Sequence, residues 1–84
     1  MNFCFVSVIR VSDIDYKFII KGKKRSIAKF KVKLDNGSIM EVVAYNKLAD
    51  RLYSKEPKNF LIEGKLIYVK KIKRLVISIK NIKI

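Results

Sequence analysis

Residues 28–45 read AKFKVKLDNGSIMEVVAY, and this stretch decides the fold. Its first half alternates apolar residues with lysines, which is the period-two pattern of a strand buried on one face. The apolar positions are Ala28, Phe30, Val32 and Leu34, and the lysines are Lys29, Lys31 and Lys33. Asn36-Gly37 then offers the two positive φ angles of a type I′ turn. The sequence therefore predicts a hairpin in which residues 39–45 pair antiparallel with the lysine-bearing strand.

Strand-like alternation also precedes this hairpin. Residues 3–11 alternate and predict a long first strand, which continues over residues 16–21 after a turn at Ser12-Asp13. Residues 22–25, GKKR, are predicted to form a basic loop before the lysine-bearing strand.

A short helix and two strands are predicted after the hairpin. Asn46 is a suitable N-cap, and the helix is expected to run for about two turns and to end before Pro57. Strands are predicted over residues 60–69 and 75–80, with a second basic loop, KKIKR, at residues 70–74. Gly64 inside the first of these strands predicts a bulge or sharp bend.

This order of elements predicts an all-β fold, the five-stranded Greek-key barrel of the OB-fold. One short helix would lie between strands 3 and 4, as that fold requires. With 84 residues the chain has room for a single domain, 1–84. Half of the residues are hydrophobic, which supplies enough apolar surface for a core.

The charge balance predicts a polyanionic partner. The chain has 20 Lys+Arg against 7 Asp+Glu, a net charge of +13. Nucleic acid is the first expectation and an acidic membrane surface the second. OB-folds bind oligonucleotides on the strand 2–3 face and through the loops after strands 1 and 4, where the cations cluster here. The predicted binding residues are Lys23, Lys24, Arg25, Lys29, Lys31, Lys33, Tyr45, Lys70, Lys71, Lys73 and Arg74.

Composition argues against several other classes of protein. The chain has no His and only Cys4, so no disulfide framework, usual zinc site or Cys–His nucleophile is expected, nor any cofactor. An enzyme is therefore the least expected class. The longest uncharged apolar stretch, residues 2–9, is shorter than the ~20 residues of a membrane-spanning helix. The order of charged and apolar residues at the start does not suit a signal peptide.

Three short segments resemble the bacterial single-stranded DNA-binding protein family. Residues 42–50, VVAYNKLAD, resemble its V-V-x-[FW]-[GN]-K-L-A-E signature, and residues 62–66, IEGKL, resemble its I-E-G-[RK]-L strand. Residues 27–30, IAKF, resemble its V-A-x-F/I segment. Together they follow the family's order and spacing along the chain. The chain is also similar to two narrower groups, the tailless dimeric primosomal replication protein B and a small plastid-encoded protein of the red-algal lineage.

The resemblance implies roles for particular residues. Tyr45 falls where the family stacks an aromatic ring on a base, whereas two stacking tryptophans of the family fall on Ile39 and near Lys71. The apolar first strand, with Phe3, Phe5 and Val6, would form a homodimer interface by strand pairing; burial by barrel closure is the alternative. The family's acidic tail, which recruits repair proteins, is not expected because residues 80–84 read KNIKI.

The expected function is sequence-nonspecific coating of single-stranded DNA in replication, repair and recombination. RNA binding by the same face is one alternative, and an adaptor or structural subunit that binds no DNA is another. Tyr16 and Tyr68 are further stacking candidates, and Tyr53 and Phe60 are expected in the core. Glu41 lies on the same basic face and is unfavourable for phosphate, and the sequence does not explain it. Residue usage typical of AT-rich genomes favours a plastid (chloroplast) location, with the bacterial cytoplasm as the alternative.

Overall fold

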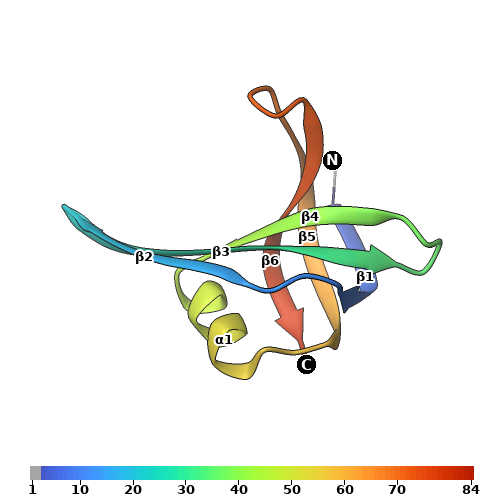
Figure 1. The fold of residues 1–84 in the computed structure, drawn as a ribbon, viewed down its shortest axis with the longest axis horizontal. Helices are drawn as coiled ribbons and strands as arrows, with labels where there is room; N and C mark the ends of the chain where they lie inside the picture. Colours follow the sequence, from blue (N-terminus) through green and yellow to red (C-terminus); the bar gives the residue numbers. More distant parts are fainter. Residues whose placement is uncertain (1–2) are drawn as a thin grey trace.

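The computed structural model describes residues 3–84, apart from the side chains of Phe3, Lys21 and Lys23. Six strands and one helix follow one another along this part of the chain (Figure 1). They are β1 (Phe3–Arg10), β2 (Asp15–Lys21), β3 (Lys23–Leu34), β4 (Ile39–Tyr45), α1 (Lys47–Lys55), β5 (Asn59–Val69) and β6 (Arg74–Lys83). The helix has nine residues, and within residues 3–84 no helix is long and apolar enough to cross a membrane.

The strands form one sheet that closes into a barrel. Its order is β1-β5-β6-β4-β3-β2, and a further pairing of β1 with β3 closes the ring. β1 and β2 both pair with β3, so together they are the predicted first strand, interrupted at residues 11–14. The interruption is held in place because Ser12 Oγ accepts a hydrogen bond from the Lys31 backbone N–H at 2.8 Å. The predicted OB-fold barrel is confirmed, with six strands in place of five.

The barrel interior is apolar and follows the predicted alternation. On the inner face of β3, Ala28, Phe30 and Val32 are buried, whereas Leu34 is only partly buried against the core. Val42 and Ala44 of β4 are also buried, and residues of β1, α1, β5 and β6 complete the core. The largest fully buried side chains are Leu52, Ile62, Ile77, Val8, Val32 and Val42. Phe60 is buried as predicted.

Tyr53 is not in the core, so its predicted burial is wrong. Its side chain remains 54% exposed. The inner side of α1 is filled by Ala49 and Leu52, which leaves Tyr53 at the edge of the helix beside β2. There its ring stacks on that of Tyr16, with ring centroids 4.2 Å apart.

The β3–β4 turn differs from the predicted type I′ geometry. Leu34 N–H donates to Ser38 O at 2.8 Å and Gly37 N–H donates to Leu34 O at 2.9 Å, which defines a three-residue loop. Gly37 has φ 87°, whereas Asn36 has no positive φ. Asn36 Oδ1 instead accepts a hydrogen bond from the Ser38 N–H at 2.9 Å. A type I turn followed by a glycine with positive φ is the common form of a three-residue hairpin loop, and it needs only one positive φ.

Asn46 begins the helix through its backbone and not through its side chain. Its side chain makes no capping hydrogen bond, so this detail of the prediction is wrong. Its φ is 56° with ψ −124°, outside the αL region, and Asn adopts a positive φ more often than most residues. Asn46 N–H donates to Ser26 O at 2.8 Å, and Ser26 Oγ donates to Asn46 O at 3.1 Å. These bonds fix the start of α1 to β3.

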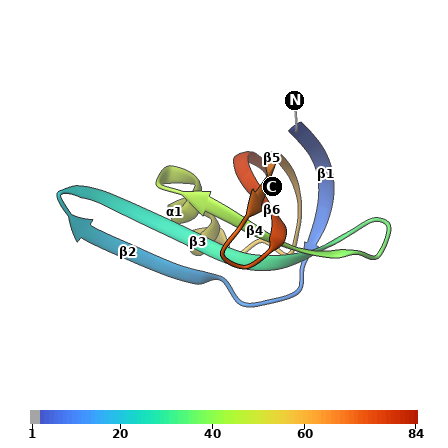
Figure 2. The same cartoon turned by 90° about the horizontal axis from the view of Figure 1, so that it is seen from above.

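Gly64 produces the predicted bend in β5. The β5–β6 register shifts between Glu63 and Gly64. A Cβ atom on Gly64 would lie 2.7 Å from both Ile77 Cγ2 and the Ser78 carbonyl oxygen, so only glycine fits there. Beyond this point the two strands project from the barrel as a hairpin, here called the β5–β6 arm (residues 66–76; Figure 1). From above, the β2–β3 hairpin and the β3–β4 turn extend to opposite sides of the molecule (Figure 2).

Candidate nucleic-acid interface

Three lysines of β3 lie in a row on the outer face of the sheet. Lys29, Lys31 and Lys33 are exposed, while the alternate residues Phe30 and Val32 are buried. Their partners on β4 are Val43, Glu41 and Ile39, respectively. The predicted separation of a buried face from a cationic face is therefore confirmed. The role of these lysines in binding stays a prediction.

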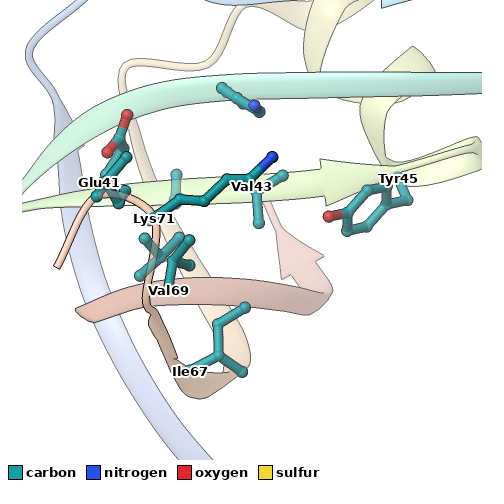
Figure 3. A pocket seen from close by; sticks show the side chains of 10 residues that line it. Glu41, Val43, Tyr45, Ile67, Val69 and Lys71 are labelled. Atoms are coloured by element: carbon teal, nitrogen blue, oxygen red, sulfur yellow. The ribbon is translucent and has the colours of Figure 1, made fainter. Parts of the chain in front are cut away.

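A hollow lies beside this row, between the outer face of β4 and the β5–β6 arm (Figure 3). β6 pairs in parallel with β4, which places the arm against that face. The hollow has a volume of about 280 Å³ and is here called the β4 hollow. Its lining residues are Lys29, Glu41, Val42, Val43, Tyr45, Ile67, Val69, Lys71, Ile72 and Val76. Most of its surface is therefore aliphatic, with charged and phenolic groups around it.

Tyr45 and Glu41 lie at opposite ends of the β4 hollow, with Val43 between them (Figure 3). Tyr45 is 43% exposed, whereas Val43 is only 5% exposed and forms the floor. The side chain of Lys71 extends toward Val43 from the arm (Figure 3). A partly exposed ring beside two ammonium groups is the arrangement that single-strand binders use for bases and phosphates.

Glu41 has a structural partner that the sequence did not reveal. Its Oε2 lies 3.9 Å from Arg74 Nη1, with 28% of the Glu41 side chain and 58% of the Arg74 side chain exposed. This Oε2 is buried and accepts no hydrogen bond. Glu41 and Arg74 also line a second hollow of about 310 Å³, together with Lys31, Ile39, Met40 and Leu75. Glu41 therefore borders two adjoining hollows along β4.

The first basic segment is not a loop, so that part of the prediction is wrong. The β2–β3 connection turns at Gly22, with φ 76°, and β3 already begins at Lys23. Continuous pairing with β2 leaves no residues for a loop, because Ile20 lies opposite Lys24 and Ile19 opposite Arg25.

The structure brings only some of the predicted cations together. Strand alternation places Arg25 on the same face as Lys29, and Lys24 on the opposite face of the hairpin. The Lys23 side chain lies outside the described part of the structure. The second basic segment is a turn at residues 70–73, in which Lys70, Lys71 and Lys73 are all exposed. Of these three, Lys71 lines the β4 hollow.

Several residues of this surface were not predicted from the sequence. Lys17 lies opposite Ile27, and Ile27 lies opposite Tyr45, so the outer face continues onto β2. Ile67 and Val69 reach the β4 hollow from the arm. Alternation places such residues on one face of a strand, but it does not reveal which strands lie side by side across a barrel.

β1 is buried on one face by barrel closure and exposed on the other, and its predicted role as a dimer interface stays a prediction. Phe5 is 67% exposed on the outside, whereas Val6 packs against the core; the side chain of Phe3 lies outside the described residues. β1 pairs with β5 from Phe3 to Ile9 but with β3 only from Val8 to Arg10. Within the described structure, residues 3–7 therefore have one unpaired edge.

The closed barrel, the helix between β4 and β5, and the cationic outer face define an OB-fold with a candidate oligonucleotide-binding surface. The chain matches no protein-family model and no curated protein sequence. Solved structures do match. The SSB domain of a protein from Synechococcus sp. superposes with a TM-score of 0.86 at 16% identity, covering 100% of this chain and 96% of that one. A small single-stranded DNA-binding protein from Mycoplasma pneumoniae gives a TM-score of 0.58 at 20% identity, covering 100% and 86%. The chain thus has the OB-fold in the form found in SSB domains.

Proposed function

We propose that this protein binds single-stranded DNA along the outer face of β3 and β4. One observation carries the proposal: Lys29, Tyr45 and Lys71 come from three separate elements and line one hollow beside the lysine row. Cations along a groove and a ring on which a base can stack are the two requirements of single-strand binding. The two similar structures support the same ligand, because one is an SSB domain and the other is a single-stranded DNA-binding protein.

The chemistry of the surface sets the mode of binding. Lysine is a strongly hydrated point charge that meets phosphate without reading sequence. Among the side chains that the structure describes, Tyr45 is the one aromatic residue lining the β4 hollow, so stacking contributes less than charge. If about five cations meet phosphates, log affinity falls with log salt at a slope of about −3.5, since each contact on a single strand contributes about −0.7.

The test is fluorescence anisotropy of a labelled oligo(dT) of about 35 nucleotides, long enough to fill more than one OB-fold site. It is titrated at three salt concentrations, with duplex DNA and matched RNA as competitors. Tight binding, a slope near the expected value and weak competition by duplex support the proposal. If RNA competes as well as DNA, the surface binds single-stranded nucleic acid in general. Salt-insensitive or absent binding refutes the proposal and favours an adaptor role.

Assembly and cellular role belong to the same proposal. We propose a homodimer formed through β1, supported by the unpaired edge at residues 3–7 and the exposed ring of Phe5. We propose that the protein coats single strands during replication, repair and recombination, and does not catalyse a reaction. A plastid location is supported by the residue usage alone. The narrower likeness to primosomal replication protein B rests on the small size of the chain.

A further inference from the structure

The β4 hollow is suited to one flat, uncharged group. Val43 and Val76, each 5% exposed, contribute its apolar surface together with Ile67 and Val69. Its volume of about 280 Å³ is at the lower limit of small-ligand pockets, which begin at about 300 Å³. A single ring system therefore fits, and burying its faces against these aliphatic side chains is favourable.

The charges around the hollow favour an anion outside it. The Lys29 and Lys71 side chains both line it, from β3 and from the arm respectively. Neither is paired with a carboxylate in the described structure, where Glu41–Arg74 is the one ion pair found. An apolar ring with a phosphate on each side matches this arrangement, and that is one nucleotide of a single strand.

Glu41 offers a hydrogen-bond acceptor at the edge of the hollow. Its Oε2 is buried 3.9 Å from Arg74 Nη1, too far for a hydrogen bond and out of reach of a base. The accepting atom is therefore the other carboxylate oxygen, Oε1, on a side chain that is 28% exposed and lines the hollow. A carboxylate near the backbone of DNA opposes phosphate, but it accepts hydrogen bonds from the amino groups of bases. Cytosine, adenine and guanine carry such a group. Thymine and uracil present carbonyl oxygens at the corresponding edge, which repel a carboxylate.

We propose that the β4 hollow receives one nucleobase of the bound strand and that Glu41 accepts a hydrogen bond from its exocyclic amino group. This inference rests on the proposed function, and it adds base preference at one position to binding that is otherwise set by phosphate. The protein therefore prefers strands of amino-bearing bases to strands of thymine or uracil. The competing explanation is that Glu41 serves only to hold Arg74.

The direct test compares two homopolymers that differ at this edge alone. Oligodeoxycytidine and oligodeoxyuridine of equal length lack the thymine methyl group and differ in the groups at positions 3 and 4 of the ring. They are titrated with the wild-type protein above neutral pH, where cytosine is unprotonated. Roughly tenfold tighter binding of the cytosine strand is expected, the effect of one hydrogen bond to a charged group. Equal affinity for both overturns the inference and leaves the proposed function standing. Binding to neither overturns both.

Glu41→Gln and Glu63→Gln provide the matched pair of variants. Each removes one negative charge, but Glu63 is exposed on β5 opposite Phe5, away from the β4 hollow. Glu41→Gln is expected to bring the affinity ratio of the two strands close to one, whereas Glu63→Gln keeps the wild-type ratio. If Glu41→Gln strengthens binding to both strands equally, its carboxylate acts only through charge and the inference fails. Thermal melting establishes whether each variant is folded. If Glu41→Gln is unfolded, the comparison of the two strands with the wild-type protein decides the inference alone.

Discussion

The ring of Tyr16 on β2 stacks on the ring of Tyr53 on α1, with centroids 4.2 Å apart and planes 13° from parallel. The Tyr16 hydroxyl also donates a 2.6 Å hydrogen bond to Asp50 Oδ1, one helical turn from Tyr53. Both contacts join the helix to the β2–β3 hairpin. The hydrogen bond from Tyr16 lowers the pKa of Asp50, and the same bond raises the pKa of Tyr16.

Tyr16→Phe tests this link through the pH dependence of stability. The lowered pKa of Asp50 contributes stability that is present above 3.8 and is lost as pH falls through its folded-state pKa. The raised pKa of Tyr16 contributes stability that is present below 10.0 and is lost as pH rises through its folded-state pKa. The wild-type protein should therefore be more stable than Tyr16→Phe between these two pH values, and the difference in stability should shrink outside them. Thermal melting across this range measures the difference, and a constant difference would contradict the assignment.

Charge reversal of the lysine row should abolish binding to single-stranded DNA. Replacing Lys29, Lys31 and Lys33 with glutamate removes three phosphate contacts and places repulsive charge along the same face. The control replaces Lys55, Lys58 and Lys83, which are exposed elsewhere, and changes the net charge by the same amount. Anisotropy titrations at one salt concentration compare the two variants. Equal loss in both would show that net charge, and not this face, governs binding.

Tyr45→Ala should weaken binding by about 1–3 kcal/mol, the usual contribution of one stacked base. Tyr45→Phe keeps the ring and should stay close to wild type. Tyr68→Ala serves as a comparison, because Tyr68 is 59% exposed on the arm but does not line the β4 hollow. Titration of all three with the same oligonucleotide measures the effect. An unchanged affinity for Tyr45→Ala would remove this ring from the binding surface.

Much of the fold was predictable because strand alternation and chain order together leave few arrangements. The lysine row on β3, the helix bounds and the bend at Gly64 all follow from local sequence. The predicted details that were wrong, such as the turn type, depend on which of several similar local conformations the chain adopts. Asn36-Gly37 supports two turn types, and the three-residue loop was selected by its own hydrogen bonds.

The binding surface was less predictable, because it depends on contacts between distant strands. Lys29 and Lys71 are far apart in sequence and meet only because β6 pairs in parallel with β4. Glu41 is unfavourable for phosphate, and its partner Arg74 is brought beside it only by the fold. Tyr53 had helical spacing suited to burial, but Tyr16 gave it a partner at the surface. Sequence pattern identifies the face of each strand, whereas barrel closure decides which faces adjoin.

Gly64→Ala should destabilise the barrel without a direct effect on ligand contacts. The added Cβ would lie 2.7 Å from the Ser78 carbonyl oxygen and Ile77 Cγ2, so β6 must move. Overpacking of this kind costs about 1–3 kcal/mol. Gly37→Ala is the comparison, because it meets no atom within 4 Å and is opposed only by its positive φ, at about 1–2 kcal/mol. Urea unfolding measures both, and a Gly64→Ala variant as stable as wild type would contradict the crowding.

The unpaired edge of β1 leads to a prediction about assembly. Pairing of residues 3–7 with the same segment of a second copy would satisfy backbone groups that β3 does not reach. Phe5→Glu places a charge on this outer surface and should shift the protein from dimer to monomer in sedimentation-velocity experiments. Phe18→Glu makes the same change on the β2–β3 hairpin, where the ring is 53% exposed, and should leave the dimer intact. A monomeric wild type would refute the dimer, and equal dissociation of both variants would place the interface elsewhere than at Phe5.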